Sequence, residues 1–182
     1  MSTVSLTLDE IFELAKKTLL ANGCDDETAS ILSDLIRNAE RDGSLSHGLF
    51  RLPAYVSGLK SGKINGKGKP EVKKISASVI KVQGNNCLAP VVLSKGLPEL
   101  AKAAKENGVA VLAINNSHHM AAMWPETEKL AEEGLVAFAC TSYKPAVAPA
   151  GAIKPLFGTN PISFAWPRPG KTPVVYDMAT AS

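Results

Sequence analysis

The spacing of apolar residues changes on either side of residues 60–74, and this change constrains the fold most. Before this stretch apolar residues recur every three or four positions, which is the spacing of helices that bury one face. After it, short apolar runs alternate with helical stretches, as in α/β domains. The stretch itself holds six lysines among glycines, a proline and an asparagine, so we interpret it as an exposed loop. We therefore expect a helical segment and basic loop over 1–70, and an α/β domain from 71 to 182.

Two helices are predicted near the start of the chain. Thr7 is suited to cap the first helix, and its apolar face continues to Gly23, which provides the stop signal. Asp25 or Asp26 can cap the second helix, which runs to Gly43. The sequence does not decide between these two caps.

A third helical stretch is expected within 46–59. It contains Pro53, which cannot donate a hydrogen bond to the carbonyl four residues back. Pro53 therefore either opens the helix or kinks a longer one, and the sequence allows both. The elements expected after the basic loop are a strand over 77–82, a helix over 94–107, a strand over 109–114, a helix over 120–133, and strands over 135–141, 162–164 and 173–176.

Charge and composition argue against several classes of protein. The net charge is +3, but lysines and acids are mixed and aromatic residues are few, so nucleic-acid binding is not expected. No apolar run approaches the roughly 20 residues of a membrane-spanning helix, and the first residues do not resemble a secretion signal. The three cysteines are far apart and match no metal-ligand spacing. We expect a cytoplasmic protein with neither membrane nor metal partners.

A glycine-rich phosphate loop between a strand and a helix is missing. Gly66 and Gly68 are followed by Lys69-Pro70 rather than by a helix, and the spacing from Gly62 to Lys67 is one residue short of a Walker A motif. Any nicotinamide-binding function therefore needs a fold other than the Rossmann fold.

The stretch from Ser46 to Pro53 is the first candidate site. If the backbone is helical from His47, then His47 and Arg51 lie on one face, four residues apart. Arg51 could bind a carboxylate through two parallel hydrogen bonds, and His47 could deliver a proton to a neighbouring atom. Alternatively, Ser46 is a helix cap and both His47 and Arg51 are ordinary surface residues.

Three further stretches carry polar groups where strands and turns meet. Residues 115–119 follow an apolar strand, and the amides at the start of the next helix could bind a phosphate. Adjacent histidines there lack the i, i+4 spacing that zinc sites favour. Residues 154–161 form a turn with a hydroxyl and an amide, and residues 176–180 end the last strand with an acid and a hydroxyl. Caps and turns explain each stretch equally well.

Four motifs together resemble the malate/L-lactate dehydrogenase-like oxidoreductases, which bind a nicotinamide cofactor without a Rossmann fold. Within this family, residues 119–126 are similar to a segment of the cyclic-imine reductases. The resemblance covers essentially the whole chain. Its motifs are Ser46-His47-Gly48 with Arg51-Leu52-Pro53, Asn116-Ser117-His118-His119, Leu156-Phe157-Gly158-Thr159-Asn160-Pro161, and Asp177-Met178-Ala179-Thr180.

The resemblance implies a role for each matched residue. Ser46 and His47 form the catalytic relay, in which His47 donates the proton, and Arg51 and Thr159 bind the substrate carboxylate. The residues expected to bind the cofactor are His119, Met120, Ala121, Ala122, Met123, Asp177, Met178 and Ala179.

The implied fold is a helical segment packed on a mixed-sheet, non-Rossmann NAD(P)-binding domain, of which 71–182 is the first part. The implied reaction is reduction of Δ1-piperideine-2-carboxylate or Δ1-pyrroline-2-carboxylate to the cyclic amino acid with NADPH, or alternatively NADH. One alternative is an NAD-dependent malate- or lactate-type dehydrogenase; another is a non-catalytic fragment. Family members are longer and commonly homodimers, so we expect a truncated chain that ends in a site loop, and a dimer for the full-length form.

Overall fold

The computed structural model describes residues 4–181, which form two compact units. The first unit is Met1–Ala103 with Val109–Ala121, and the second is Ala104–Gly108 with Ala122–Ser182. These units do not coincide with the ranges 1–70 and 71–182 suggested by the sequence. Each unit has its own three-stranded sheet, and we describe them separately.

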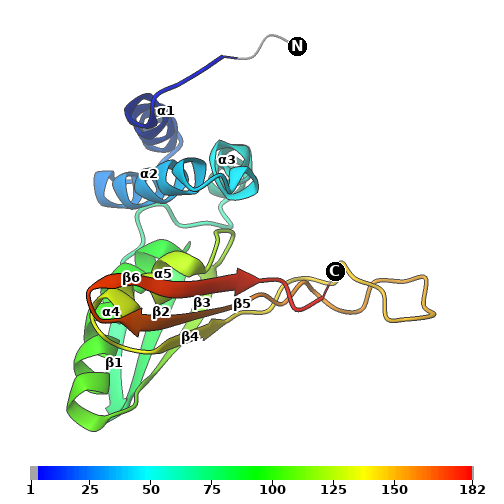
Figure 1. The fold of residues 1–182 in the computed structure, drawn as a ribbon. Helices are drawn as coiled ribbons and strands as arrows, with labels where there is room; N and C mark the ends of the chain where they lie inside the picture. Colours follow the sequence, from blue (N-terminus) through cyan, green and yellow to red (C-terminus); the bar gives the residue numbers. More distant parts are fainter. Residues whose placement is uncertain (1–3, 182) are drawn as a thin grey trace. The chain divides into compact units, whose positions relative to one another are not determined.

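The first unit begins with the helices α1 (Leu8–Ala21) and α2 (Asp26–Arg41), which pack against each other (Figure 1). Thr7 caps α1 in a reciprocal capping box with Glu10, which confirms the predicted cap. Asp25 caps α2 by accepting from the amide of Thr28 at 2.9 Å, which decides between the two candidate caps. Within residues 4–181, no helix is both long and apolar enough to cross a bilayer.

The third helical stretch is not one continuous helix. It consists of two short 3-10 helices, η1 (Leu45–His47) and η2 (Leu49–Arg51), followed by α3 (Leu52–Lys60). The break lies at Gly48, whose ψ of −137° is far from a helical value. Pro53 lies in the first turn of α3, so it opens that helix and kinks nothing.

The first sheet is mixed. Its order is β1-β2-β3, with β1 antiparallel and β3 parallel to β2, and α4 connects β2 to β3. The bounds of these elements are β1 Glu71–Ser76, β2 Val79–Leu88, α4 Ala89–Asn107 and β3 Val111–His118. Two predictions are corrected here: the basic loop ends in a strand, and the strand expected to stop at residue 114 continues to 118.

Two apolar clusters support the first unit. One joins α1, α2 and α3 with Leu88 at the end of β2, and the other lies between α4 and the sheet. At Gly96 of α4 an added Cβ would meet Leu112 Cδ2 at 2.9 Å and Val82 Cγ2 at 3.1 Å. The helix therefore approaches the sheet closely because this position has no side chain.

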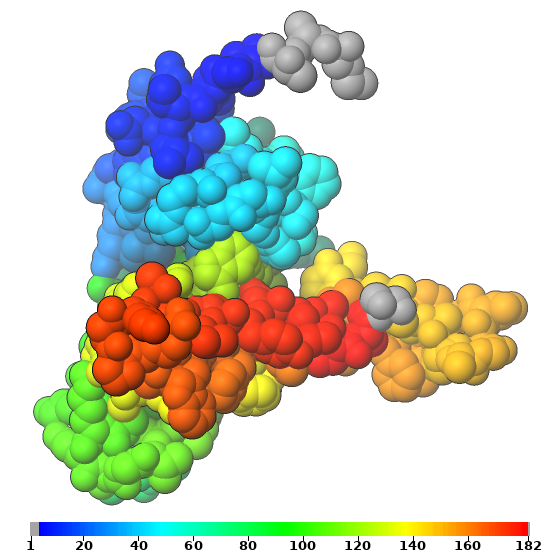
Figure 2. Space-filling model, viewed as in Figure 1, coloured from blue at the N-terminus to red at the C-terminus, as the bar shows by residue number. Residues whose placement is uncertain are grey.

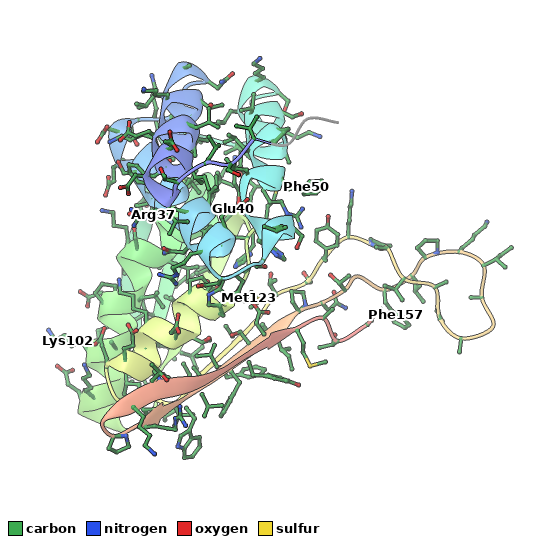
Figure 3. All side chains as sticks on the ribbon, turned by 45° about the horizontal axis from the view of Figure 1, so that its top comes forward. Arg37, Glu40, Phe50, Lys102, Met123 and Phe157 are labelled. Atoms are coloured by element: carbon green, nitrogen blue, oxygen red, sulfur yellow. The ribbon has the colours of Figure 1, made fainter. Side chains whose placement is uncertain are left out.

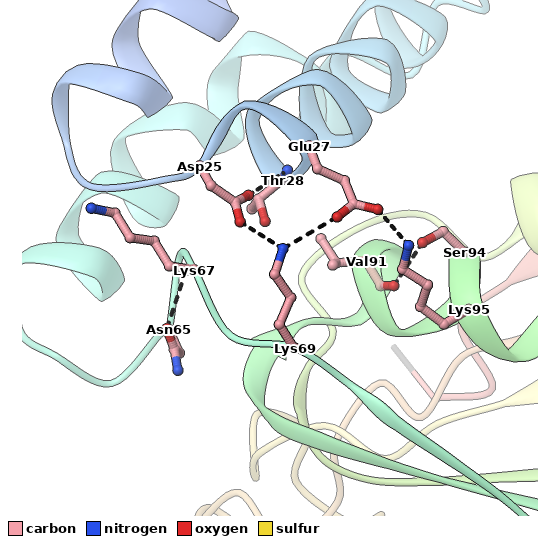
Figure 4. Close-up of polar contacts among 9 residues, drawn as sticks. All are labelled: Asp25, Glu27, Thr28, Asn65, Lys67, Lys69, Val91, Ser94 and Lys95. Carbon is pink, nitrogen blue, oxygen red and sulfur yellow. Dashed lines mark hydrogen bonds and ion pairs between the residues drawn. The ribbon is translucent and has the colours of Figure 1, made fainter.

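Ion pairs connect the basic loop to the start of α2, and α2 to α4, within the first unit (Figure 4). Lys69 Nζ donates to Asp25 at 2.9 Å and to Glu27 at 3.3 Å, and Lys95 of α4 also donates to Glu27. Burial alone would raise the pKa of Asp25, but hydrogen bonds from Thr28 and Lys69 lower it to about 2. Lys69 is thus a structural lysine rather than a free loop charge.

The second unit contains the antiparallel sheet β4-β5-β6, against which α5 packs. The elements are α5 Trp124–Glu132, β4 Ala137–Cys140, β5 Ile162–Arg168 and β6 Lys171–Met178. Between β4 and β5 the chain forms a long arm in which Val147 pairs with Phe157. Figure 2 shows this arm, in yellow and orange, extending away from the sheet of its own unit. Its base carries Thr159.

Candidate active site

His47 is oriented by two serine hydroxyls. Its Nδ1 lies 3.1 Å from Ser46 Oγ and 3.2 Å from Ser44 Oγ, and the ring is partly buried in η1. The contact with Ser46 fits the relay implied by the resemblance. The sequence analysis did not identify Ser44. The available signal was its position three residues before His47, because residues three apart are neighbours in a helical turn. Because Nδ1 faces these hydroxyls, Nε2 is the nitrogen that points away from them.

Glu40 of α2 fixes the turn that follows His47. Its Oε1 accepts a hydrogen bond of 2.7 Å from the amide of Leu49, the first residue of η2. The carboxylate packs directly on Gly48, where an added Cβ would lie 2.6 Å from Glu40 Cδ. Figure 3 shows Glu40 on α2 close to the turn that carries Phe50. Glu40 therefore explains the glycine of the Ser-His-Gly motif, and nothing local in the sequence indicates this contact.

Arg51 is partly buried at the end of η2, and its Nε has no hydrogen-bond partner among residues 4–181. The hydroxyl of Tyr55, four residues later on α3, is also buried without a partner. Burial raises the pKa of Tyr55 to about 12, and the positive charge of Arg51 opposes this rise. Because η1 and η2 are separate turns, His47 and Arg51 do not share one helical face as the sequence suggested.

One apolar cluster of the first unit joins two of the predicted site segments. Leu52 and Tyr55, next to Arg51, belong to the same cluster as Leu88, and Met120 packs against it. Leu88 also pairs with His118 across β2 and β3. The structure therefore brings the His47–Arg51 turn and the start of the predicted cofactor segment to the same core.

Residues 115–118 lie on β3 and not in a turn before a helix. The pairing of β2 with β3 shifts register beyond Gln83, and three asparagines around this shift have positive φ: Asn85 at 48°, Asn86 at 59° and Asn116 at 52°. Asparagine tolerates this conformation better than most residues. The predicted turn was wrong because a register shift lets an asparagine-rich segment stay in the sheet.

Asp177 of β6 connects the two cofactor segments predicted in the sequence. Its Oδ2 accepts hydrogen bonds from the amides of Met123 at 2.8 Å and Trp124 at 2.9 Å. These amides stand at the start of α5, where the sequence suggested a phosphate site. A carboxylate of the protein itself already binds them, so this helix end is not an open anion site.

Thr159 lies at the base of the arm, next to residues that follow β6. Its carbonyl accepts a hydrogen bond of 2.9 Å from the amide of Thr180, and the hydroxyl of Thr180 donates to the carbonyl of Asn160 at 2.8 Å. Asn160 has a φ of 38°, and its side chain accepts from the amide of Tyr143 at 3.0 Å. Hydrogen bonds from Thr180 and Tyr143 thus hold the backbone at Thr159 and Asn160.

The predicted site residues fall into two groups. The first unit holds Ser46, His47, Arg51 and residues 119–121, and the second holds Ala122, Met123, Thr159 and residues 177–179. Ala122 and Met123 are buried, whereas Met178 and Ala179 are exposed at the end of β6. In the part of the chain that the structure describes, no three His, Cys, Asp or Glu side chains gather in a metal-binding cluster.

Comparison with known proteins identifies the family. The family model described as malate/L-lactate dehydrogenase matches residues 6–182. The chain belongs to the malate/L-lactate dehydrogenase family. This family membership accounts for the four sequence motifs.

Among individual members of this family, cyclic-imine reductases are similar over the whole chain. The Δ1-pyrroline-2-carboxylate/Δ1-piperideine-2-carboxylate reductases of Pseudomonas syringae pv. tomato and Pseudomonas putida are 41% and 42% identical, over 99% and 100% of this chain. The alignments cover 52% and 53% of those two proteins. The chain therefore spans about half the length of the relatives that it matches.

Solved structures agree with this assignment. The crystal structure of Δ1-piperideine-2-carboxylate reductase from Pseudomonas syringae pv. tomato has a TM-score of 0.92 at 42% identity, with coverage of 98% of this chain and 54% of that one. Malate dehydrogenase from Pyrococcus horikoshii OT3 has a TM-score of 0.89 at 33% identity, with coverage of 97% and 51%. The mixed, non-Rossmann α/β fold is confirmed.

Proposed function

We propose that this chain carries the substrate and proton-donor side of an NAD(P)H-dependent reduction of a cyclic imine carboxylate, Δ1-piperideine-2-carboxylate or Δ1-pyrroline-2-carboxylate. The observation that carries the proposal is the contact of His47 Nδ1 with two serine hydroxyls in η1, directly before the short helix η2 that ends at Arg51. A histidine oriented at one nitrogen can transfer a proton at the other. The similarity to cyclic-imine reductases supports this choice of substrate.

In this proposal Arg51 binds the substrate carboxylate. A guanidinium offers parallel donors that match the two carboxylate oxygens, and Thr159 adds a hydroxyl donor. His47 then supplies a proton from Nε2 to the substrate nitrogen, while Ser44 and Ser46 hold its ring in position. Glu40 contributes indirectly, because it fixes the turn between His47 and Arg51.

We propose residues 119–123 and 177–179 as the cofactor contacts, with NADPH preferred over NADH. Asp177 supports this set because its hydrogen bonds connect the two segments. Because the amides at the start of α5 already donate to Asp177, they are not available to a phosphate of the cofactor. We therefore assign the cofactor contacts to side chains and carbonyls around that helix end. The bound nicotinamide supplies the hydride.

The second candidate is a 2-hydroxy-acid dehydrogenase of the malate or lactate type. The description of the matching family and the fold of the Pyrococcus malate dehydrogenase favour it. The two reactions differ in their need for an acid, because an imine nitrogen can be protonated before hydride transfer, whereas a ketone oxygen gains charge as the hydride arrives.

The test is a turnover assay on the purified 182-residue chain. Δ1-Piperideine-2-carboxylate, oxaloacetate and pyruvate are each supplied with NADPH and with NADH, and oxidation of the reduced cofactor is followed by absorbance. We expect the cyclic imine with NADPH to be the best pair. Faster turnover of a keto acid would favour the second candidate, and no turnover with any pair would indicate a non-catalytic fragment.

Assembly and location are also proposals. We propose that the protein is a homodimer located in the cytoplasm. The homodimer is what the resemblance to the longer family members implies. Sedimentation equilibrium and cell fractionation test these two points. A monomer at assay concentrations, or recovery outside the cytoplasmic fraction, would contradict them.

A further inference from the structure

Three buried polar atoms of the first unit have no hydrogen-bond partner within residues 4–181, and two of them belong to residues four apart in sequence. One is Nε of Arg51, a donor, and the other is the hydroxyl of Tyr55, which can donate or accept. Tyr55 is only 1% exposed. Buried polar groups in native proteins nearly always have a partner, so two adjacent exceptions call for a functional explanation.

Arg51 and Tyr55 are four residues apart where η2 leads into α3. Arg51 and Leu52 both have right-handed helical φ and ψ, so the chain from Arg51 into α3 has no non-helical residue between η2 and α3. Residues four apart in such a segment are neighbours on its surface. The positive charge of Arg51 lowers the pKa of Tyr55, against the larger rise caused by burial.

The surroundings of Tyr55 make its hydroxyl conspicuous. The ring lies in an apolar cluster with Leu32, Ile36 and Leu88. A phenylalanine would fill the same volume and would avoid burying a hydroxyl without a partner. A partner acquired in a liganded state would explain why the hydroxyl is retained.

We propose that Tyr55 is a positioning residue for Arg51: when a carboxylate binds the guanidinium, Nε–H of Arg51 donates to the hydroxyl oxygen of Tyr55. This bond satisfies both unpartnered groups at once and fixes the plane of the guanidinium, so that its two terminal nitrogens face the carboxylate. The inference rests on the proposed function, in which Arg51 binds the substrate carboxylate. Because its pKa is raised to about 12, the phenol stays neutral and adds no competing charge.

The experiment measures carboxylate binding directly. L-Proline, the reduced form of Δ1-pyrroline-2-carboxylate, is titrated calorimetrically into the full 182-residue chain, and pyrrolidine serves as the same ring without the carboxylate. The variants are Tyr55→Phe and Arg51→Lys, with Tyr143→Phe in the exposed arm as the matched control. We expect Tyr55→Phe to weaken proline binding about tenfold, Arg51→Lys to weaken it at least as much, and Tyr143→Phe to leave it unchanged.

A second readout separates positioning from loss of structure. In the 15N-labelled wild-type chain, the Nε–H resonance of Arg51 should become protected from solvent exchange when proline is added, and this protection should be absent in Tyr55→Phe. Unchanged proline affinity in Tyr55→Phe, with weak binding in Arg51→Lys, would overturn the role of Tyr55 and leave the proposed function standing. Unchanged affinity in both variants, or no proline binding by the wild type, would contradict the proposed function as well. If Tyr55→Phe fails to fold, the wild-type exchange measurement decides alone.

Discussion

Replacement of Asp177 by alanine should destabilise the second unit strongly. A single oxygen of Asp177 accepts from two amides, those of Met123 and Trp124, at the start of α5. Met123 is buried and Trp124 is partly buried, so in Asp177→Ala water can replace the lost acceptor only in part. Since α5 packs against the sheet of this unit, fraying of its first turn loosens the whole unit.

The size of the effect follows from these two contacts. A hydrogen bond to a charged group contributes about 1.5–3 kcal/mol, and loss of a helix N-cap costs about 0.5–2 kcal/mol. Partial exposure of Trp124 reduces the sum, so we expect Asp177→Ala to lower the free energy of unfolding by about 2 kcal/mol. Asp177→Asn keeps one acceptor oxygen for both amides and loses only the charge. Its cost should be about 1 kcal/mol.

Urea unfolding followed by tryptophan fluorescence is the appropriate assay, because both tryptophans, Trp124 and Trp166, belong to the second unit. With a slope of about 2 kcal/mol per molar urea, the midpoint for Asp177→Ala should fall by about 1 M. Glu132→Ala, at the exposed far end of α5, is the control and should change stability by less than about 0.5 kcal/mol. Equal midpoints for wild type and Asp177→Ala would refute the capping role.

Three further predictions concern the first unit. The Asp25 carboxylate, with its pKa lowered to about 2, should stabilise the unit above pH 3.8 and lose this contribution as pH falls toward 2, so wild type and Asp25→Asn should converge in acid-unfolding curves followed by circular dichroism. Gly48→Ala should displace the Glu40 carboxylate and lower the free energy of unfolding by about 1 kcal/mol in thermal melts. His47→Gln should reduce turnover of a keto acid by about 10²- to 10⁴-fold, and turnover of a cyclic imine by less.

Each of these has a control that isolates its cause. Lys69→Met should remove much of the acid dependence of Asp25, and a stability difference that grows below pH 3.8 would contradict the assignment. In a Glu40→Ala background the cost of Gly48→Ala should vanish, and an unchanged cost would point to the backbone instead. If His47→Gln reduced turnover of the keto acid and of the cyclic imine equally, His47 would orient the substrate and not protonate it.

Local signals in the sequence predicted the first two helices and the family, and only the choice between Asp25 and Asp26 as the second cap needed the structure. The caps at Thr7 and Asp25 depend on side chains three residues from the amide that they bind, so their geometry is set within one turn. The four motifs likewise identify the malate/L-lactate dehydrogenase family without any structure. The assignment of Ser46 beside His47 is local too, and the distance between them supports it.

The sequence alone could not give the contacts made by residues far apart in the chain. The strand β1 was hidden in a lysine-rich loop because all its side chains are exposed, so no apolar alternation marks it. The partner of Glu40 is nine residues away, and the partners of Asp177 are more than fifty residues away. Only the tertiary structure decides such contacts, because they depend on which strand and helix ends the packed cores bring together, whereas caps and motifs depend on a few neighbouring residues.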